Sequence, residues 1–329
     1  TNVAGVVHSA GRFAGLLGAT TLDANGLIND FPAGHHITFG KFSCASSVDD
    51  TFHSELILIW HSNPSYTSIP YANFITEARY NGSQVVCIAP DYSPSALMAE
   101  SFVPIRPATD AALALSMCQV IIEEGLYHTD FVRSQTDLTL LVHRESRRFV
   151  RGPELLEGER EDQFYWWDNA TGAVEIAPRG SLILDESDPA LEGTFTATAV
   201  DGSTIEVTTV CELRREQLAE YTPEKAGPIC GINPEVIRNL ARDAARKRTK
   251  IIEGFNTPKY YHGDLMERAM CLFLALTGNW GRPGTGIQGL ALAGLDGYML
   301  FGMKQKRGVA ETIRVMEGLE GAIESLRSQ

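Results

Sequence analysis

The sequence lacks the closely spaced cysteines that hold metal clusters or cross-link small secreted domains. The closest two of its six cysteines are 19 residues apart, and the set lies at positions 44, 87, 118, 211, 230 and 271. This spacing excludes a zinc ribbon, an iron–sulfur ligand set and a disulfide scaffold. We therefore expect the cysteines to be buried free thiols.

The sequence also lacks a long apolar run and an excess of positive charge. No segment approaches the roughly 18 consecutive apolar residues of a membrane-spanning helix, so we expect no transmembrane segment. The chain has 28 Lys and Arg against 41 Asp and Glu, which gives a formal net charge of −13. An acidic surface repels phosphate backbones, so neither nucleic acid nor an anionic membrane is expected as the main partner.

Two common catalytic signatures are absent as well. The sequence contains neither the G-x-x-x-x-G-K-[ST] phosphate loop nor the G-x-S-x-G nucleophile elbow. The first absence argues against a stand-alone nucleotide-binding protein of the P-loop class. What is present is an ordinary globular composition over 329 residues, with 44% hydrophobic and 21% charged residues. At about 150 residues per domain, this length predicts two domains.

The clearest fold signal lies in residues 54–91. Apolar runs at 55–60 and 84–89 predict buried parallel strands. Pro70 suits the first position of a helix that the pattern extends over 71–80. A strand, a helix and a strand within about 38 residues predict a right-handed βαβ unit.

The same alternation continues along the chain. It predicts strands at 102–105 and 250–254, and helices from Thr109 to Gly125 and over 130–135, 233–246, 262–277 and 309–327. Residues 140–215 differ, because a hairpin around Asp201-Gly202 joins predicted strands at 194–200 and 203–210. The sequence therefore predicts an α/β fold of the doubly wound type with a strand-rich elaboration.

Polar loops follow four of the predicted strands, where parallel sheets bind ligands. Each loop alone also fits ordinary turn and helix-cap chemistry. The candidate binding residues, in chain order, are Ser62, Asn63, Pro64 and Thr67, then Asp91, then Thr109 and Asp110, and finally Gly254, Asn256 and His262. A separate group near a Gly-Pro loop comprises Asp23, Asp30, His35 and His36. That group fits a metal site, an acid–base pair or an exposed polar loop.

Taken together, these segments resemble the catalytic subunits of molybdopterin oxidoreductases of the dimethyl sulfoxide reductase family. The segments that carry the resemblance are Ile59–Thr67, Phe74–Gly82, Val103–Ala112 and Leu274–Gly286. Their order and spacing also match, and the resemblance covers most of the chain, weakly over about 145–195. Within the family, the chain looks most like the branch of nitrate, selenate and perchlorate reductases and ethylbenzene dehydrogenase.

The resemblance implies a molybdenum ion held by two molybdopterin guanine dinucleotides. The segment Asp30-Phe-Pro-Ala-Gly34 looks like the one in which this branch supplies an aspartate ligand, so Asp30 is the predicted molybdenum ligand. A hard carboxylate suits a high-valent metal centre. His35 or His36 would then stabilise the substrate or carry a proton.

The resemblance also assigns roles to the strand-end residues. Ser62, Asn63, Pro64 and Thr67 would face the phosphates of one dinucleotide. Asp91 and Asp110 would recognise its ribose and guanine, and Thr109 is a further candidate cofactor-binding residue. Gly254, Asn256 and His262 would line the second binding crevice. These are the same positions that the strand ends indicate.

By the family pattern, the chain looks like the central part of a longer subunit. Residues 1–40 and 245–329 would form one split α/β domain of Rossmann-like type, into which a second such domain, 41–244, is inserted. The family's iron–sulfur cluster would lie in a preceding region, because no cysteine group here can hold it. The family also implies an iron–sulfur partner subunit and a periplasmic location.

The implied reaction is a two-electron reduction of an oxyanion or hydroxylation of a substrate at molybdenum, with a small molecule as the substrate. The sequence does not choose between these directions. The alternative is a degenerate, cofactor-free family member that serves as a binding or structural domain. An intact Asp30 and intact strand-end polar residues favour the enzyme.

Overall fold

The computed structural model describes residues 4–20, 32–40, 46–179, 184, 186–254 and 257–289. Two compact units divide the chain: residues 1–31 with 290–329, and residues 32–289. In the first unit, the structure describes helix α1 (Ala4–Leu17). The predicted helix over 309–327 lies outside the described residues. All other elements below belong to the second unit.

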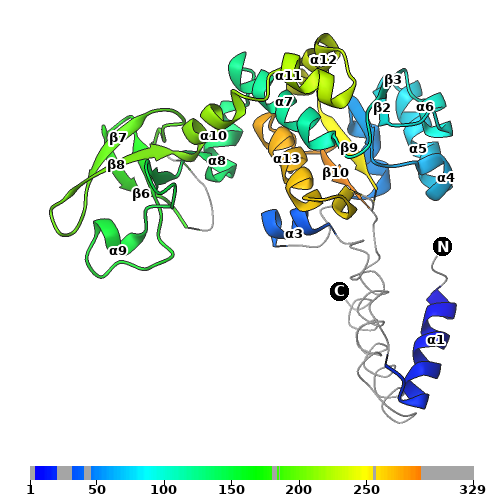
Figure 1. Ribbon diagram of the computed structural model, residues 1–329, viewed down its shortest axis with the longest axis horizontal. Coiled ribbons are helices and arrows are strands. Elements are labelled where there is room, and N and C mark those ends of the chain that lie inside the picture. Colours follow the sequence, from blue (N-terminus) through cyan, green and yellow to red (C-terminus); the bar gives the residue numbers. More distant parts are fainter. Residues whose placement is uncertain are drawn as a thin grey trace. The chain divides into compact units, whose positions relative to one another are not determined.

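A five-stranded parallel sheet is the centre of the second unit (Figure 1). Its order is β10-β9-β1-β2-β3, and the strands are β1 (Leu56–Trp60), β2 (Gln84–Ala89), β3 (Ser101–Pro104), β9 (Thr249–Glu253) and β10 (Gly286–Gln288). Every adjacent pair in this sheet is parallel. The strands predicted at 55–60, 84–89, 102–105 and 250–254 are thereby confirmed to within one residue.

Helices cover both faces of the sheet because alternate side chains of each strand point to opposite sides. Leu56, Leu58 and Trp60 pack with α7 (Asp110–Glu123), α12 (Pro234–Arg246) and α13 (Gly263–Leu276). Ile57 and Ile59 pack on the other side with α5 (Ile69–Tyr80) and α6 (Pro94–Met98). Figure 1 shows these two helical layers on either side of the sheet. The fold is therefore mixed α/β, as the sequence predicts.

Short elements at the sheet edges complete this part of the unit. They are α3 (Ala33–Phe39), the 3-10 helix η1 (Val48–His53), α4 (Pro64–Thr67) and the 3-10 helix η3 (Thr257–Lys259). A G-x-G-x-x-G spacing occurs at Gly284, Gly286 and Gly289, but β10 occupies its middle. The spacing therefore does not form the strand-to-helix turn of a dinucleotide fingerprint.

The strand-rich elaboration consists of two small antiparallel sheets. One has the order β4-β8-β7, from β4 (Leu141–His143), β7 (Thr194–Thr198) and β8 (Thr204–Thr209), and the other pairs β5 (Tyr165–Asp168) with β6 (Ala173–Ile176). The hairpin of β7 and β8 around Asp201-Gly202 confirms the sequence prediction. The nearby helices are α8 (Thr129–Gln135), η2 (Asp137–Thr139), α9 (Gly152–Leu155), α10 (Val210–Leu218) and α11 (Pro223–Cys230).

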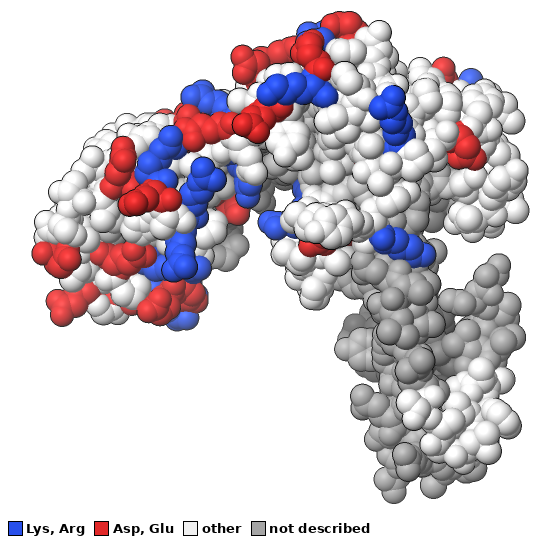
Figure 2. All heavy atoms as spheres, viewed as in Figure 1, with Lys and Arg blue, Asp and Glu red and all other residues white. Residues whose placement is uncertain are grey.

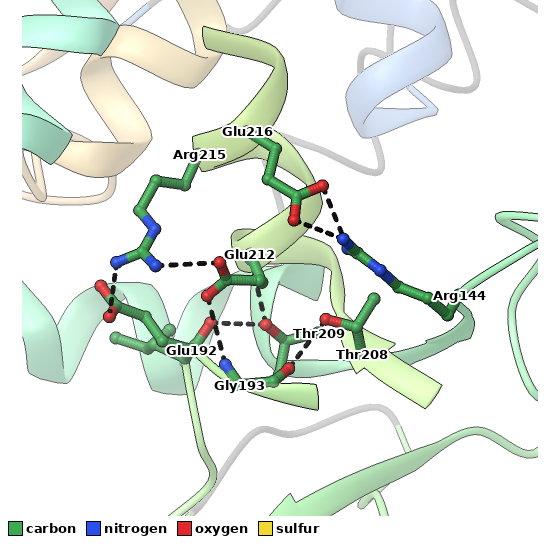
Figure 3. Close-up of polar contacts among 9 residues, drawn as sticks. Arg144, Glu192, Gly193, Thr208, Thr209, Glu212, Arg215 and Glu216 are labelled. Carbon is green, nitrogen blue, oxygen red and sulfur yellow. Dashed lines mark hydrogen bonds and ion pairs between the residues drawn. The ribbon is translucent and has the colours of Figure 1, made fainter. Parts of the chain in front are cut away.

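Polar contacts fasten α10 to this elaboration (Figure 3). The Thr209 hydroxyl donates to the Leu191 carbonyl and accepts the Glu212 N–H, which caps the helix. Arg215 pairs with Glu192 and Glu212, each at 2.9 Å. On the face drawn in Figure 2, charged residues of both signs crowd over this region. These contacts give the dense charge of the elaboration a structural role.

The described residues bear on three further predictions. Five cysteines, 87, 118, 211, 230 and 271, are buried free thiols, as expected. Among the described residues, no helix is long and apolar enough to cross a membrane. β9 and β10, from the predicted split domain, share one sheet with β1, β2 and β3 from the predicted inserted domain. The division into 1–40 with 245–329 and 41–244 stays a prediction that must accommodate this pairing.

Candidate functional site

The candidate site lies at the carboxyl edge of the parallel sheet. Because all five strands run in the same direction, the loops that follow them meet at one edge. The loops after β1, β2, β3 and β9 carry the described candidate residues, which are Ser62, Asn63, Pro64 and Thr67, Asp91, Thr109 and Asp110, and Gly254 and His262. Asn256 and Asp30 lie outside the described residues. The structure thus brings the strand-end candidates to one edge.

The loops after β1 and β2 are tied to each other. Ser95, fully buried at the start of α6, donates its hydroxyl to the Asn63 side-chain oxygen at 2.6 Å and accepts the Ser65 N–H at 3.2 Å. Asn63 precedes α4 but makes no side-chain cap there. Its amide therefore fixes the spacing of two strand-end loops. Thr67 and Asp91 are exposed beside this contact.

Asp110 is buried and holds two side chains from the end of β1. Its Oδ1 accepts the Trp60 indole N–H at 2.7 Å, and its Oδ2 lies 2.9 Å from His61 Nε2. Asp110 is 2% exposed and Trp60 is fully buried. The sequence predicted Asp110 to accept from a guanine edge, whereas here both oxygens have partners within the chain. Thr109 precedes α7 without a side-chain cap and donates its hydroxyl to the Arg106 carbonyl.

The backbone at this edge is strained. Among the described residues, the non-glycine residues with positive φ are His61, Ala108, Arg147 and His262. His61, Ala108 and His262 all lie in loops that follow sheet strands, at φ of 56°, 65° and 58°. L-residues adopt this region at a cost of about 1–3 kcal/mol, and such residues cluster at functional sites. The strain therefore favours the carboxyl edge as the place of the candidate site.

His35 belongs to a buried group of charges at the same edge. Its Nε2 lies 3.1 Å from Glu253 Oε2, at the last residue of β9. Although burial lowers it, the pKa of His35 is raised overall by the hydrogen bond and charge of Glu253 and by the charge of Glu267. Burial, together with the charge of Glu253, raises the pKa of Glu267 to about 8. His36 is exposed, so only one of the two predicted histidines is enclosed.

Gly34 brings α3 against α13 with no room for a side chain. A Cβ at this position would lie 2.4 Å from the Asp264 carbonyl oxygen and 2.5 Å from Glu267 Cβ. The Gly34 N–H donates to Glu267 Oε2 at 2.6 Å. This contact fixes the start of α3 against α13.

Gly34→Ala is expected to lower the free energy of unfolding by about 1–3 kcal/mol, because the added methyl group overpacks the contact of α3 with α13. Urea unfolding of the chain measures this. Gly289→Ala is the matched control, since a Cβ there meets nothing within 4 Å. Equal stability of the two variants would show that α3 does not pack as described.

Sequence reasoning missed His61, Glu253 and Glu267. Glu253 and Glu267 lie within segments predicted as a short strand and an apolar helix, so nothing in the pattern distinguished them as site residues. Among the described residues, no group of three or more His, Cys, Asp or Glu side chains is arranged to hold a metal ion. The predicted ligand Asp30 lies outside the described residues, so its role stays a prediction.

Comparison with known proteins identifies the family of the chain. The family model described as molybdopterin oxidoreductase matches residues 3–320. The chain belongs to the molybdopterin oxidoreductase family. The resemblance drawn from the strand-end motifs is thereby confirmed. The match includes the whole parallel sheet and the strand-rich elaboration.

Several curated relatives are alpha subunits of enzymes. The chain is 39% identical over 313 residues to the perchlorate reductase alpha subunit of Dechloromonas aromatica, a match that covers 87% of this chain and 34% of the relative. It is 40% identical to the dimethylsulfide dehydrogenase alpha subunit of Rhodovulum sulfidophilum and 37% identical to the chlorate reductase alpha subunit of Ideonella dechloratans. Each of these two matches covers 83% of this chain and 30% of the relative. The chain therefore spans about a third of the length of these relatives.

Proposed function

We propose that the chain is part of the catalytic subunit of a molybdenum oxidoreductase that reduces an oxyanion by two electrons. Family membership over residues 3–320, joined to polar loops at one sheet edge, is the observation that carries this proposal. The perchlorate and chlorate reductase relatives support an oxyanion as the substrate class. The protein would bind, orient and tune the cofactor rather than perform the electron chemistry itself.

The cofactor in this proposal is molybdenum with two molybdopterin guanine dinucleotides. The residues at the carboxyl edge fit such a group, because exposed Thr67 and Asp91 and half-buried Ser62 and Asn63 offer hydroxyl, amide and carboxylate groups. Loop N–H groups suit phosphates, and a carboxylate after the second strand suits ribose hydroxyls. Gly254, Asn256 and His262 would face the second dinucleotide. Each Rossmann-like half in the predicted domain division would then hold one nucleotide.

Asp30 is the proposed protein ligand of the metal. The bound group supplies two-electron redox chemistry and an open position for substrate. The chain's own residues fix the ligand segment: Gly34 is held by Glu267, and His35 by Glu253. Asp110 keeps two side chains in place: Trp60 at the end of β1, and His61 at the start of the loop that follows.

A second candidate reaction is oxidation of a substrate by hydroxylation. The dimethylsulfide dehydrogenase relative, at 40% identity, favours it, since that enzyme is named for the oxidative direction. A steady-state assay of the full-length subunit separates the two. Turnover of perchlorate, chlorate or nitrate with a reduced viologen supports the reductase, and turnover of an organic sulfide with an oxidised dye supports the alternative.

A cofactor-free structural module is the contrasting proposal. It predicts a folded full-length subunit that contains no molybdenum and turns over none of these compounds. An iron–sulfur cluster in a preceding region, an iron–sulfur partner subunit and a periplasmic location belong to the enzyme proposal by family analogy.

Asp30→Ala in the full-length subunit is expected to reduce bound molybdenum at least tenfold and to abolish turnover, because it removes the proposed metal ligand. Elemental analysis and release of guanine nucleotide from protein made in a molybdenum-replete host measure the loss. Asp49→Ala is the matched control, since Asp49 is an exposed aspartate on η1. An Asp30→Ala variant with wild-type metal content and turnover would remove Asp30 from this role.

A further inference from the structure

Three ionisable side chains from distant parts of the chain are buried together where α3, β9 and α13 meet. His35, Glu253 and Glu267 are 3%, 6% and 0% exposed. His35 Nε2 pairs with Glu253 Oε2 at 3.1 Å, and Glu267 Oε2 accepts the Gly34 N–H at 2.6 Å. Within the described part of the chain, Oε1 of Glu253 and Oε1 of Glu267 have no hydrogen-bond partner. This arrangement is unusual, because buried polar atoms are normally paired.

The charges of this group balance only when it holds an extra proton. A protonated His35 with two carboxylates would leave a net charge of −1 in a buried place, which is costly. Protonation of Glu267 brings the sum to zero. The strongest charges on Glu267 are Glu253 of β9, which raises its pKa, and His35 of α3, which lowers it. The other charged residues of α13 and η3 (Asp264, Arg268 and Lys259) are half-buried or exposed.

We propose that His35, Glu253 and Glu267 form a buried proton reservoir that serves the reaction at the carboxyl edge of the sheet. This inference rests on the proposed function. When one oxygen atom of an oxyanion leaves as water, two protons and two electrons are consumed, and the electrons come through the bound cofactor. Glu267 gives up one of the two protons and solvent supplies the other, and Glu267 takes a proton back from solvent after the reaction.

The geometry assigns the transferable proton to one atom. Oε2 of Glu267 is occupied by the Gly34 N–H, so the proton resides on Oε1. Gly34 lies four residues after the proposed ligand Asp30, so the acidic proton is held by a residue that contacts the chain shortly after the proposed ligand in the sequence. His35 stays paired with Glu253, so release of the proton leaves a net charge of −1 on the cluster, and the cost of this buried charge favours the uptake of another proton by Glu267. The three residues are therefore positioning and proton-holding residues.

Infrared spectroscopy of the 329-residue chain tests the proton on Glu267 without any cofactor. At pH 6.5 we expect a carbonyl band of a protonated carboxylic acid that is lost in Glu267→Gln and titrates near pH 8. In Glu253→Gln the titration should move to lower pH, because the charge that raises the pKa is gone. Glu220→Gln, at an exposed glutamate in the turn between α10 and α11, should leave the band unchanged. A wild-type spectrum without this band, or a band that survives Glu267→Gln, would overturn the proposal.

The full-length molybdenum subunit tests the use of the proton. Glu267→Gln is expected to lower kcat at least tenfold with unchanged KM and molybdenum content, and to remove the alkaline limb of the rate profile near pH 8. An unchanged kcat with the same limb would refute the proton supply. A subunit without metal or turnover that still shows the infrared band would refute the proposed function and leave only the proton-holding cluster.

Discussion

Asp110→Ala is expected to lower the free energy of unfolding of the chain by about 3–5 kcal/mol. The substitution removes the acceptor that Trp60 and His61 share, and Trp60 is fully buried. A buried donor that loses its partner costs more than the bond contributed, because water cannot replace the lost acceptor. Urea unfolding followed by tryptophan fluorescence measures the change.

Asp110→Asn separates this structural role from guanine recognition. The asparagine oxygen still accepts the Trp60 N–H, so we expect a loss of about 1 kcal/mol instead. If Asp110 recognises guanine, Asp110→Asn in the full-length subunit should lose bound guanine nucleotide while stability changes little. If Asp110 mainly holds Trp60 and His61, the bound guanine nucleotide should fall in proportion to the loss of stability, strongly in Asp110→Ala and little in Asp110→Asn. Asp130→Ala, at an exposed aspartate in the first turn of α8, is the control and should change neither stability nor nucleotide content.

The fold was predictable where the sequence carries local periodicity. The strand at 84–89 and the helix that begins at Pro234 match the structure, because an apolar run and an Asn-Pro cap are visible in a few residues. Asn233 does cap α12, as its side chain accepts the Glu235 N–H. The helices α10 and α11 were not predicted, because α10 is largely polar and α11 contains Pro228.

The candidate site was predictable only in part. The strand-end loops follow from topology, since parallel strands must end at one edge. The contact of Gly34 with Glu267 joins residues 233 positions apart, and a single sequence holds no signal for such a pair. The partners of the β9 charges were equally hidden, because Lys250 and Glu253 flank two isoleucines in a short predicted strand whose pattern does not show which charges are buried.

Two carboxylates that interact with the charged residues of β9 give opposite dependences of stability on pH. Glu267 lies next to Glu253, and its pKa is raised from 4.5 to about 8. Its contribution to the free energy of unfolding is therefore largest below pH 4.5 and is lost as the pH rises to about 8. Asp50, the partner of Lys250, behaves in the other way. Burial raises the pKa of Asp50, but hydrogen bonds from Lys250, Gly284 and Ser46 lower this pKa overall. Its contribution is present above pH 3.8 and is lost as pH falls through the lowered pKa.

Lys250→Ala is expected to lower the free energy of unfolding at pH 7 by about 3–5 kcal/mol. The side chain of Lys250 is fully buried, and its Nζ lies 2.5 Å from Asp50 Oδ2 and 2.9 Å from Ser46 Oγ. Asp50 Oδ1 in turn accepts the Gly284 N–H at 2.9 Å, so the pair joins β9, η1 and the loop before β10. Removal of the cation leaves Asp50 largely enclosed without its charge partner. Urea unfolding at pH 7 and at a pH below 3.8 measures the loss, which should shrink as the pH falls through the lowered pKa of Asp50.

The double variant Lys250→Met with Asp50→Asn tests the pairing itself. The double variant removes both charges together, and its methionine fills most of the space of the lysine stem. Its free energy of unfolding should therefore fall much less than that of Lys250→Ala alone. Lys225→Ala, at an exposed lysine on α11, is the control and should change stability by less than about 0.5 kcal/mol.

Lys250 lies at the amino end of β9, opposite the edge that carries Glu253. The full-length Lys250 variants should therefore keep their molybdenum below their unfolding temperature, and loss of metal from a folded Lys250 variant would contradict this separation of the two ends.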